Sequence, residues 1–342
     1  MNTSYFKDFI TKNTAPPQAT KIGIYNSKGT RVGGLDLGNL TFPIYETKQY
    51  SFGAISDLHL QRNTGTEDFT TALDFFENEG VEFICIDGDL TQSGTIDHLT
   101  QYKEYVDTYS PNVPIYAITG NHETYGGLDL GSVISTYTGQ PLYYSFTKGN
   151  DVFIMVGIKG EVTLFADGEL QWLYETLEAN RNKRCFVFMH VLPGNGNIAT
   201  CGNAYGSYNN LCWTHATQPS VFISLLQHYK NTVWFHGHSH FKFSMQVKDC
   251  TYANYDEADG YKSIHIPSIT VPRDDANLDG ETESLENGSE GYVVDVYSNG
   301  IHLKGRDFVN GVYLPIASYW IDTTLQTISP NTFTDSTGTI TT

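Results

Sequence analysis

From residue 50 onward, apolar positions repeat with the period of a strand and then with the period of a helix, in turn. The helix pattern is clearest at residues 67–79, where apolar side chains recur at third and fourth positions until Gly80. The first half of this region predicts strand, helix, strand, helix and strand at residues 51–56, 67–79, 81–86, 95–109 and 113–119. This order favours a mainly parallel sheet with right-handed crossovers.

The second half of the region continues with more strands. Residues 142–146 and 152–158 form an expected hairpin, because they flank Lys148-Gly149-Asn150. The other predicted elements are helices at 167–179 and 219–229 and strands at 184–189, 232–235, 241–247, 262–266, 291–297 and 300–304. Residues 191–212 are rich in Gly and Asn and too long for an ordinary connection, which indicates a functional loop.

Both ends of the chain differ from this region. Residues 1–48 contain Pro16-Pro17 and a hairpin pattern around Ser27-Lys28-Gly29, so they are predicted to form an N-terminal arm. Residues 49–310 are predicted to form the main domain. Residues 311–342 are assigned to a C-terminal extension, since their last part is rich in Thr and Ser and poor in apolar residues.

The net charge and the composition limit the classes of molecule that the protein is expected to bind. The chain of 342 residues has a formal charge of −18, which disfavours a nucleic-acid polymer or an anionic membrane as the main partner. A phosphorylated small-molecule or polymer substrate stays compatible, because bound metal ions supply positive charge. We find neither a secretory signal near the N-terminus nor an apolar run of transmembrane length. The expected location is the cytoplasm, or a virion or tail if a phage encodes the protein. Oligomeric state is left open.

The cysteines do not indicate a disulfide framework. Cys85 and Cys185 lie in apolar runs and are predicted to be small core residues. Cys201 and Cys212 flank a polar loop and could pair, but reduced thiols are expected in the absence of a secretory signal.

Five short runs of metal-binding residues each end an expected strand. They are Asp57-Leu58-His59, Gly88-Asp89, Gly120-Asn121-His122-Glu123, His190, and Gly237-His238-Ser239-His240. In an open α/β sheet, groups at the carboxyl ends of neighbouring strands converge on one crevice. Oxygen and imidazole donors brought together there suit divalent transition metals. Each run alone could be a surface pair, a turn, a helix cap or a core histidine, but their joint order argues against coincidence.

The spacing within the runs is compatible with ligation. Asp57 and His59 are two apart, so both side chains can face one side at a strand end. Gly88 permits the tight turn that brings Asp89 to the sheet edge, where its two carboxylate oxygens could bridge two ions. Asn121 offers a neutral carbonyl oxygen.

The complete set resembles the calcineurin-like metallophosphoesterase superfamily, whose pattern is D-x-H, GD, GNH[DE], H and GHxH. All five elements occur here in the family's order, and the resemblance covers residues 50–305. It implies an α/β fold, a four-layer αββα sandwich with two mixed β-sheets face to face. It also implies one metal ion held by Asp57, His59, Asp89 and His240, and another held by Asp89, Asn121, His190 and His238.

The same resemblance implies a phosphoesterase, with phosphodiesters favoured over monoesters, that uses two divalent ions of Mn, Fe or Zn. Two such ions can clamp a phosphoryl group and generate a hydroxide nucleophile at neutral pH. His122 is expected to donate a proton to the leaving oxygen or to stabilise the transition state, with ligand orientation as the alternative. Glu123 stands where many relatives have Asp, and it is expected to orient an imidazole or to cap a helix.

Two further segments carry candidate chemistry. The acidic stretch 275–286 fits the EF-hand loop pattern, with candidate Ca²⁺ ligands Asp275, Asn277, Asp279, Glu281 and Glu286. Flanking helices are not evident, so a solvated acidic loop is the competing interpretation. Arg273 precedes this stretch and could approach the phosphate. The loop 191–212 begins after His190 and is expected to wall the substrate cleft.

A structural or binding protein of a phage tail or cell surface, retaining the same fold, is the alternative hypothesis. The N-terminal hairpin and the Thr-rich C-terminal tail favour it, because such flanks accompany domains of that kind. The complete set of seven donor side chains favours the enzyme, since a scaffold would not need all of them.

Overall fold

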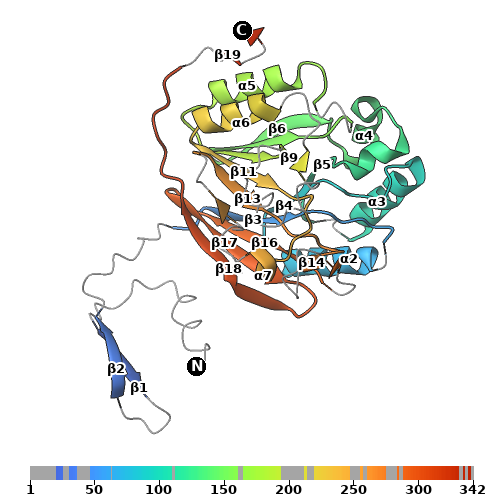
Figure 1. Ribbon diagram of the computed structural model, residues 1–342. Coiled ribbons are helices and arrows are strands. Elements are labelled where there is room, and N and C mark those ends of the chain that lie inside the picture. Colours follow the sequence, from blue (N-terminus) through green and yellow to red (C-terminus); the bar gives the residue numbers. More distant parts are fainter. Residues whose placement is uncertain are drawn as a thin grey trace. The chain divides into compact units, whose positions relative to one another are not determined.

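The chain divides into two compact units, residues 1–45 and 46–342, in the computed structural model shown in Figure 1. In the smaller unit, β1 (Lys21–Tyr25) and β2 (Arg31–Asp36) pair in antiparallel fashion, where the sequence predicts a hairpin. The structure describes residues 21–25, 31–36, 47–62, 64–109, 112–160, 165–193, 212–213, 219–246, 255–256, 260–274, 283–284, 288–330, 334–335 and 338–339, some of them by backbone alone.

Two six-stranded mixed sheets form the larger unit. In the first sheet, β3, β4 and β5 are parallel, and β16, β17 and β18 continue it in antiparallel fashion. Its strands, in spatial order, are β18 (Val312–Asp322), β17 (Gly300–Asp307), β16 (Glu290–Val296), β3 (Tyr50–Ile55), β4 (Phe83–Asp87) and β5 (Ile115–Ile118).

In the second sheet, β13, β11, β8 and β7 are parallel, and the edge strands β12 and β6 are antiparallel to their neighbours. Its strands, in spatial order, are β12 (Tyr255–Asp256), β13 (Lys262–His265), β11 (Thr232–His236), β8 (Cys185–Phe188), β7 (Asp151–Val156) and β6 (Tyr143–Lys148). Short two-stranded pairs join β9 (Leu192–Pro193) with β10 (Cys212–Trp213), β14 (Arg273–Asp274) with β15 (Glu283–Ser284), and β19 (Thr334–Asp335) with β20 (Gly338–Thr339).

Helices cover the outer face of each sheet, so the layers follow the order helix, sheet, sheet, helix (Figure 1). Phe69 and Phe76 of α2 share a buried apolar cluster with Ile84 of β4, and Leu173 of α5 shares another with Val187 of β8. The helices are α2 (Gly65–Glu79), α3 (Ile96–Tyr109), η1 (His122–Gly126), α4 (Leu130–Thr138), α5 (Glu169–Ala179), α6 (Pro219–His228) and α7 (Phe243–Gln246). The four-layer αββα sandwich predicted from the family resemblance is confirmed.

An aromatic core joins the two sheets. Phe52 of β3 stacks on Phe83 of β4 with ring centroids 5.4 Å apart. It also meets Phe153 and Phe186 of the second sheet edge-on, at 5.2 and 5.6 Å. Edge-to-face pairs of this kind add about 0.5–1.5 kcal/mol each beyond the area that they bury. The core therefore fixes how the strands of one sheet lie over those of the other.

Some segments differ from the expected elements. Residues 241–247 are predicted as a strand, but only an isolated bridge at Phe241 is extended, and α7 follows it. The N–H of Phe243 donates to the Glu290 carboxylate at 2.8 Å, a contact that starts this turn and that a short apolar run does not reveal. Residues 312–322, assigned to the C-terminal extension, pair with β17 as an edge strand of the first sheet.

The segment after β18 also docks on the folded unit. Asn231 and Gln326 exchange two hydrogen bonds, of 2.7 and 2.8 Å, and Ile328 is buried in the core of the second sheet. Gln326 and Ile328, which belong to the expected C-terminal extension, are therefore part of the folded unit.

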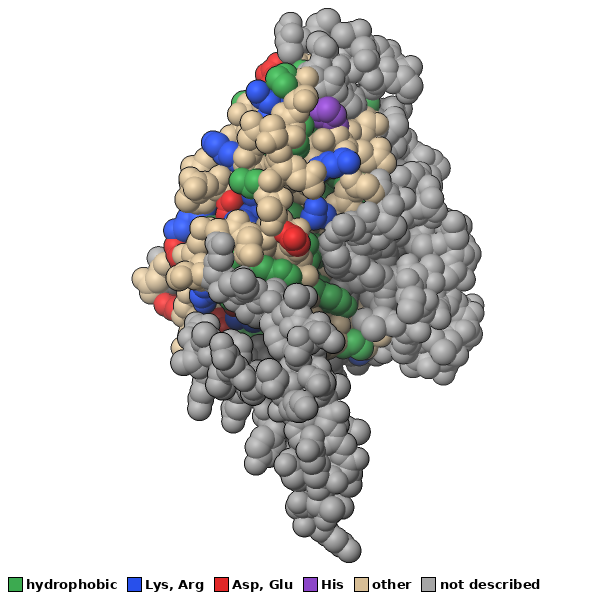
Figure 2. Space-filling view, turned by 90° about the vertical axis from the view of Figure 1, so that its left-hand side faces the viewer, with side chains coloured by type: hydrophobic (Ala, Val, Ile, Leu, Met, Phe, Trp, Pro, Cys, Tyr) green, Lys and Arg blue, Asp and Glu red, His purple; other side chains and the backbone are tan. Residues whose placement is uncertain are grey.

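Figure 2 shows one face of the protein, on which Lys and Arg side chains are scattered among acidic and apolar ones. Among the described residues of this face, the basic groups do not gather into the stripe that a polyanion would need. Within the described residues, the helices are too short or too polar to span a membrane.

A buried ion pair ties the sheets together at the amino ends of their parallel strands. Arg184 donates to both oxygens of Asp151, at 3.1 and 2.6 Å, and Tyr50 donates to the same carboxylate at 2.6 Å. The remaining guanidinium nitrogen donates to the carbonyl oxygens of Tyr297 and Gly300, which flank the turn between β16 and β17. Burial and the Asp151 carboxylate raise the pKa of Tyr50, so its hydroxyl stays protonated.

We expect Asp151→Ala to lower the free energy of unfolding by about 3–5 kcal/mol, because it leaves the buried Arg184 charge without its carboxylate. Asp107→Ala is the control, since Asp107 is 61% exposed in its pair with Lys103 and should cost at most about 1 kcal/mol. Guanidinium denaturation of both variants measures the difference. Equal losses in the two variants would contradict the assigned role.

Candidate metal centre

Each of the five runs of metal-binding residues directly follows a strand, and those strands belong to the parallel parts of the two sheets. The pairings are Asp57 and His59 after β3, Asp89 after β4, Asn121 after β5, His190 after β8, and His238 and His240 after β11. The carboxyl ends of parallel strands lie at one edge of their sheet. Because the aromatic core holds the two sheets face to face, the carboxyl ends of both sheets lie at the same end of the sandwich.

The backbone is strained where these side chains converge. Among the described residues, five that are not glycine have φ in the left-handed region, and all five are expected metal ligands. They are Asp57 (54°), His59 (42°), Asp89 (48°), His238 (71°) and His240 (63°). Such a conformation costs on the order of 1–3 kcal/mol per residue and persists only where surrounding contacts enforce it. The strain marks this end of the sandwich as a functional site.

Two glycines allow the loops to approach one another. A Cβ atom at Gly237 would overlap Ser56 and Asp57, and one at Gly120 would overlap Asp89 and His190. These two positions therefore require glycine for close packing of backbone against ligand side chains.

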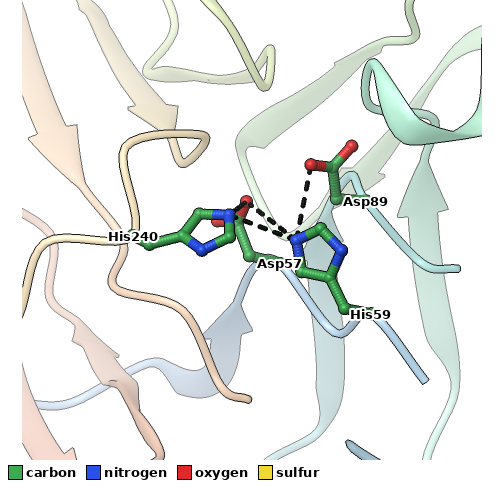
Figure 3. Close-up of side chains that lie close together, drawn as sticks. All are labelled: Asp57, His59, Asp89 and His240. Carbon is green, nitrogen blue, oxygen red and sulfur yellow. Dashed lines mark hydrogen bonds and ion pairs between the residues drawn. The ribbon is translucent and has the colours of Figure 1, made fainter. Parts of the chain in front are cut away.

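A first ligand group consists of Asp57, His59, Asp89 and His240, each of which is buried (Figure 3). One donor atom from each lies within 4.8 Å of the others. His240 Nε2 is 3.0 Å from Asp57 Oδ1 and 3.1 Å from His59 Nε2, and His59 Nε2 is 3.7 Å from Asp89 Oδ2. Two imidazole nitrogens and two carboxylate oxygens at this separation surround one point, as the ligands of a divalent ion do.

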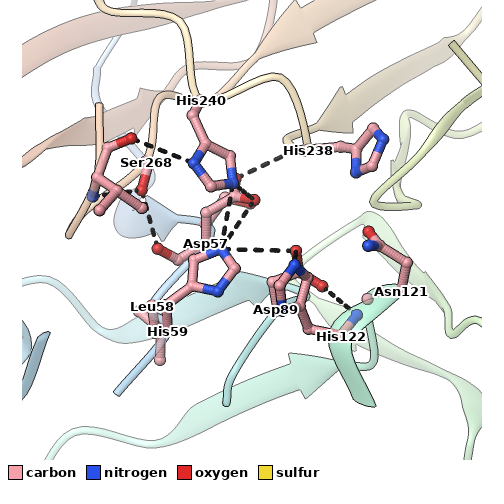
Figure 4. A network of polar contacts seen from close by, with 12 residues as sticks. Asp57, Leu58, His59, Asp89, Asn121, His122, His238, His240 and Ser268 are labelled. Carbon is pink, nitrogen blue, oxygen red and sulfur yellow. Dashed lines mark hydrogen bonds and ion pairs between the residues drawn. The ribbon is translucent and has the colours of Figure 1, made fainter. Parts of the chain in front are cut away.

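A second group consists of Asp89, His190 and His238, so Asp89 belongs to both. His190 Nε2 lies 3.2 Å from Asp89 Oδ2. In Figure 4, His59 and His240 lie on one side of Asp89, and Asn121 and His238 lie on the other. The division matches the two ligand sets expected from the family resemblance, with Asp89 between them.

Buried polar atoms at this centre lack the partners that a protein interior normally supplies. Asn121 Oδ1 has no hydrogen-bond partner among the described residues. The nearest contacts of Asp57 Oδ1, Asp89 Oδ2 and His190 Nε2 are other candidate metal ligands of the same centre, at 3.0 and 3.2 Å. A buried acceptor without a partner costs about 1–3 kcal/mol, and native proteins rarely leave one. Cations bound among these atoms would satisfy them together, so the residues present fit a pair of metal ions.

Backbone carbonyl groups fix the imidazole tautomers. His240 Nδ1 donates to Val271 O at 3.1 Å, and His190 Nδ1 donates to Asp87 O. Each bond keeps a proton on Nδ1, so Nε2 is the ring nitrogen that can bind a metal ion once it carries no proton.

Electrostatics at the centre favour charged carboxylates. Burial alone would raise the pKa of Asp57 and of Asp89, but neighbouring imidazoles outweigh it and lower both pKa values. Burial would lower the pKa of His190, but Asp89 and Asp57 raise it to about 10. Burial and a neighbouring imidazole lower the pKa of His59 and of His238 to about 3, so both rings are neutral and keep a lone pair for ligation.

Glu123 has a different role from the two that the sequence suggested. Its carboxylate accepts hydrogen bonds from the N–H of Thr91 at 2.9 Å and from the N–H of Gly120 at 2.8 Å. The Thr91 hydroxyl donates to it as well, at 3.0 Å. Both carboxylate oxygens are thus used to join the loop after β4 to the turn after β5, rather than to orient an imidazole or cap a helix. Glu123 thereby supports the backbone that carries Asp89 and Asn121.

The remaining candidate residues are placed as follows. Arg273 lies beside the run Gly237-His238-Ser239-His240, because its backbone N–H donates to His240 O at 2.7 Å. The candidate Ca²⁺ ligands lie outside the described residues, as do residues 194–211 of the expected cleft loop.

Contacts from residues 268–271 hold the first ligand run, and sequence reasoning missed them. The Ser268 hydroxyl donates to Asp57 O at 3.0 Å (Figure 4). The Thr270 hydroxyl donates to Leu58 O. More than 200 positions separate these partners, so no local pattern reveals the contact. Tyr125 also contacts the centre, and its place four residues after Asn121 would be a detectable signal if a helical turn were expected there.

The fold and the donor set together define an αββα protein whose ligands are arranged for a dinuclear metal site. Residues 50–242, more than half of the chain, match the sequence profile of the calcineurin-like phosphoesterases, and the chain belongs to this family. A comparison with curated protein sequences finds no match.

Solved structures share the fold at low sequence identity. A dimetal phosphatase from Danio rerio superposes with a TM-score of 0.55 and 16% identity, covering 80% of this chain and 100% of that one. The purple acid phosphatase PPD1 of yellow lupin seeds gives a TM-score of 0.57 and 13% identity, over 90% of this chain and 62% of that one. GAP50, the anchor in the inner membrane complex of Plasmodium, superposes with a TM-score of 0.52 and 14% identity, covering 83% of this chain and 91% of that one. These similarities establish the fold.

We expect the metal-free protein to bind two Mn²⁺ ions, with an affinity that rises with pH. The pKa of His190 is about 10, so at neutral pH this ring carries a proton that must leave before Nε2 binds an ion. Because an ion bound at this position displaces that one proton, the affinity there rises about tenfold per pH unit below that pKa.

Isothermal titration calorimetry at pH 6, 7 and 8, in buffers of different ionisation enthalpy, measures both the affinity and the number of protons released. His302→Asn, on β17, is the control and should behave as the unmodified protein does. An affinity that does not change with pH would show that His190 does not exchange its proton for a metal ion.

Proposed function

We propose that the protein hydrolyses phosphoric esters, phosphodiesters in preference to monoesters, with two divalent metal ions. The observation that carries the proposal is the buried Asp89 carboxylate, which two groups of donor side chains share. When bound, two such ions supply positive charge for the phosphoryl oxygens and acidify a water molecule to a nucleophile at neutral pH. Mn, Fe and Zn all accept this mixture of oxygen and imidazole donors.

His122 is the proposed proton donor to the leaving oxygen. Its Nδ1 donates to Gln92 O at 2.8 Å, which turns Nε2 toward the centre, 3.9 Å from Asp89 Oδ2. Its backbone N–H donates to Asp89 Oδ1 at 2.8 Å, so the residue is anchored to the shared ligand. The side chain is 19% exposed, whereas that of Asp89 is 1% exposed. A substrate can therefore reach His122, and its imidazolium form can protonate a departing alkoxide.

Charge supports the preference for phosphodiesters. A phosphodiester carries one negative charge and a monoester carries up to two, and the formal charge of the protein is −18. The field of an acidic protein disfavours the dianion more strongly. Arg273, beside His240, is the proposed contact for a non-bridging phosphate oxygen. The proposed substrate is a phosphorylated small molecule or polymer other than a nucleic acid.

A structural or binding role is the second candidate, favoured by the likeness to GAP50, which is described as an anchor. A protein with that role needs the fold but no particular donor set. Hydrolysis of a phosphoric ester therefore distinguishes the enzyme from the structural protein. Substitution of a metal-ligand residue shows whether the measured activity belongs to this protein or to a contaminant.

We expect the purified protein with Mn²⁺ to hydrolyse bis-p-nitrophenyl phosphate faster than p-nitrophenyl phosphate, and Asp89→Ala to abolish both activities. His122→Asn should lower kcat about 10²–10⁴-fold, because it removes the proton donor, while both metal ions stay bound. Release of p-nitrophenolate, together with metal analysis of each variant, measures these effects. A protein that binds two ions and turns over neither ester, with Mn, Fe or Zn, would favour the structural role.

A further inference from the structure

We propose that Tyr125 is a positioning residue for the metal centre. Its hydroxyl holds the side-chain amide of Asn121 in the one orientation that directs the amide oxygen to the ion position of Asp89, His190 and His238. The inference deepens the proposed function, since it concerns the same centre and rests on a second ion being bound there.

The amide of Asn121 needs an external group to set its orientation. Its oxygen can bind a cation, but its NH₂ group is a donor and cannot. The two ends are similar in size, so packing alone distinguishes them poorly. Asn121 Nδ2 donates to the Tyr125 hydroxyl at 2.9 Å, whereas Oδ1 is buried without a hydrogen-bond partner among the described residues. The hydroxyl thus occupies the donor end and leaves the oxygen for the ion.

Helix η1 places the hydroxyl where it is needed. Asn121 is the residue before this helix, and its carbonyl oxygen accepts hydrogen bonds from the N–H and the hydroxyl of Thr124, at 3.0 and 2.7 Å. These two bonds fix the backbone of Asn121, and Tyr125 then fixes its side chain.

The ring of Tyr125 is held separately from its hydroxyl. Its centroid lies 4.6 Å from that of His122, and the residue is 49% exposed. Phenylalanine would preserve this contact and would bury no additional surface. Tyr125→Phe therefore removes the bond to Asn121 and leaves the ring packing in place.

Without the hydroxyl, the Asn121 NH₂ group loses its acceptor and the amide can turn its nitrogen toward the ion. Loss of a group that orients a metal ligand lowers metal affinity about 10–100-fold in other proteins. We expect that loss at one ion position and no change at the position of His59 and His240, which lie on the other side of Asp89 from Asn121 in Figure 4.

Calorimetric titration of the full chain with Mn²⁺, without substrate, tests the proposal. For Tyr125→Phe we expect the Kd of one ion to rise about 10–100-fold and the other to stay within about twofold. Low-temperature electron paramagnetic resonance at limiting Mn²⁺ should show less of the exchange-coupled pair signal and more isolated ions. Tyr109→Phe, 42% exposed on α3, is the matched control and should leave both Kd values unchanged.

A double-mutant cycle with Asn121→Asp provides a second test. A carboxylate has an oxygen at both ends, so its orientation no longer matters, and Tyr125→Phe should then change the weaker Kd by less than about threefold. An undiminished effect in the Asp background would overturn the orientation mechanism.

Kinetic data separate this inference from the proposed function. At saturating Mn²⁺, Tyr125→Phe should regain nearly the kcat of the unmodified protein. Unchanged Kd values would overturn the inference, and a low kcat that Mn²⁺ does not restore would then assign the hydroxyl to substrate contact. If the unmodified protein binds two ions and hydrolyses no ester, the function is wrong, but a weakened Kd in Tyr125→Phe still supports the positioning role.

Discussion

Buried negative charge is the constraint on which this end of the molecule depends. The side chains of Asp57 and Asp89 are at most 1% exposed, yet neighbouring imidazoles keep both ionised by lowering their pKa values. Two carboxylates in a dry site repel each other and require compensation. One protonated imidazole, His190, supplies part of it in the metal-free protein. A pair of divalent ions supplies more positive charge and satisfies the unpaired donor atoms, so the centre is organised for cations.

Holding these charged groups close together requires a rigid fold. The two ends of the sandwich have different roles in it. Phe52 of the first sheet meets Phe153 and Phe186 of the second sheet edge-on, and these contacts fix how one sheet lies over the other. Arg184 and Asp151 fasten the amino ends of the strands, and the ligand loops occupy the carboxyl ends. A frame held in this way can keep five ligand residues in strained left-handed conformations, since relaxing any of them would require the surrounding loops to move.

Sequence reasoning could place the ligands because each follows a strand with a clear apolar pattern, and a glycine precedes Asp89, Asn121 and His238. It could not find the contacts of Ser268 with Asp57 or of Glu123 with Thr91, which depend on how separate loops pack. It also assigned β18 to an extension, because the burial of an edge strand alternates too weakly to give a strong signal. The periodicity of apolar residues predicts which face of a helix or strand is buried. Hydrogen bonds between loops that are distant in the sequence produce no such periodicity, so they cannot be predicted in this way.

The fold alone does not decide the activity, since structures at 13–16% identity include two phosphatases and an anchor protein. The donor atoms of this chain are more informative. A scaffold without ions would gain stability if apolar side chains replaced buried polar groups such as the Asp89 carboxylate and the Asn121 amide. It would also gain if the strained ligand loops relaxed. The buried polar groups and the strained backbone lie at the same place, beside the partly exposed His122. Metal-dependent chemistry at this place explains why the protein keeps these two destabilising features.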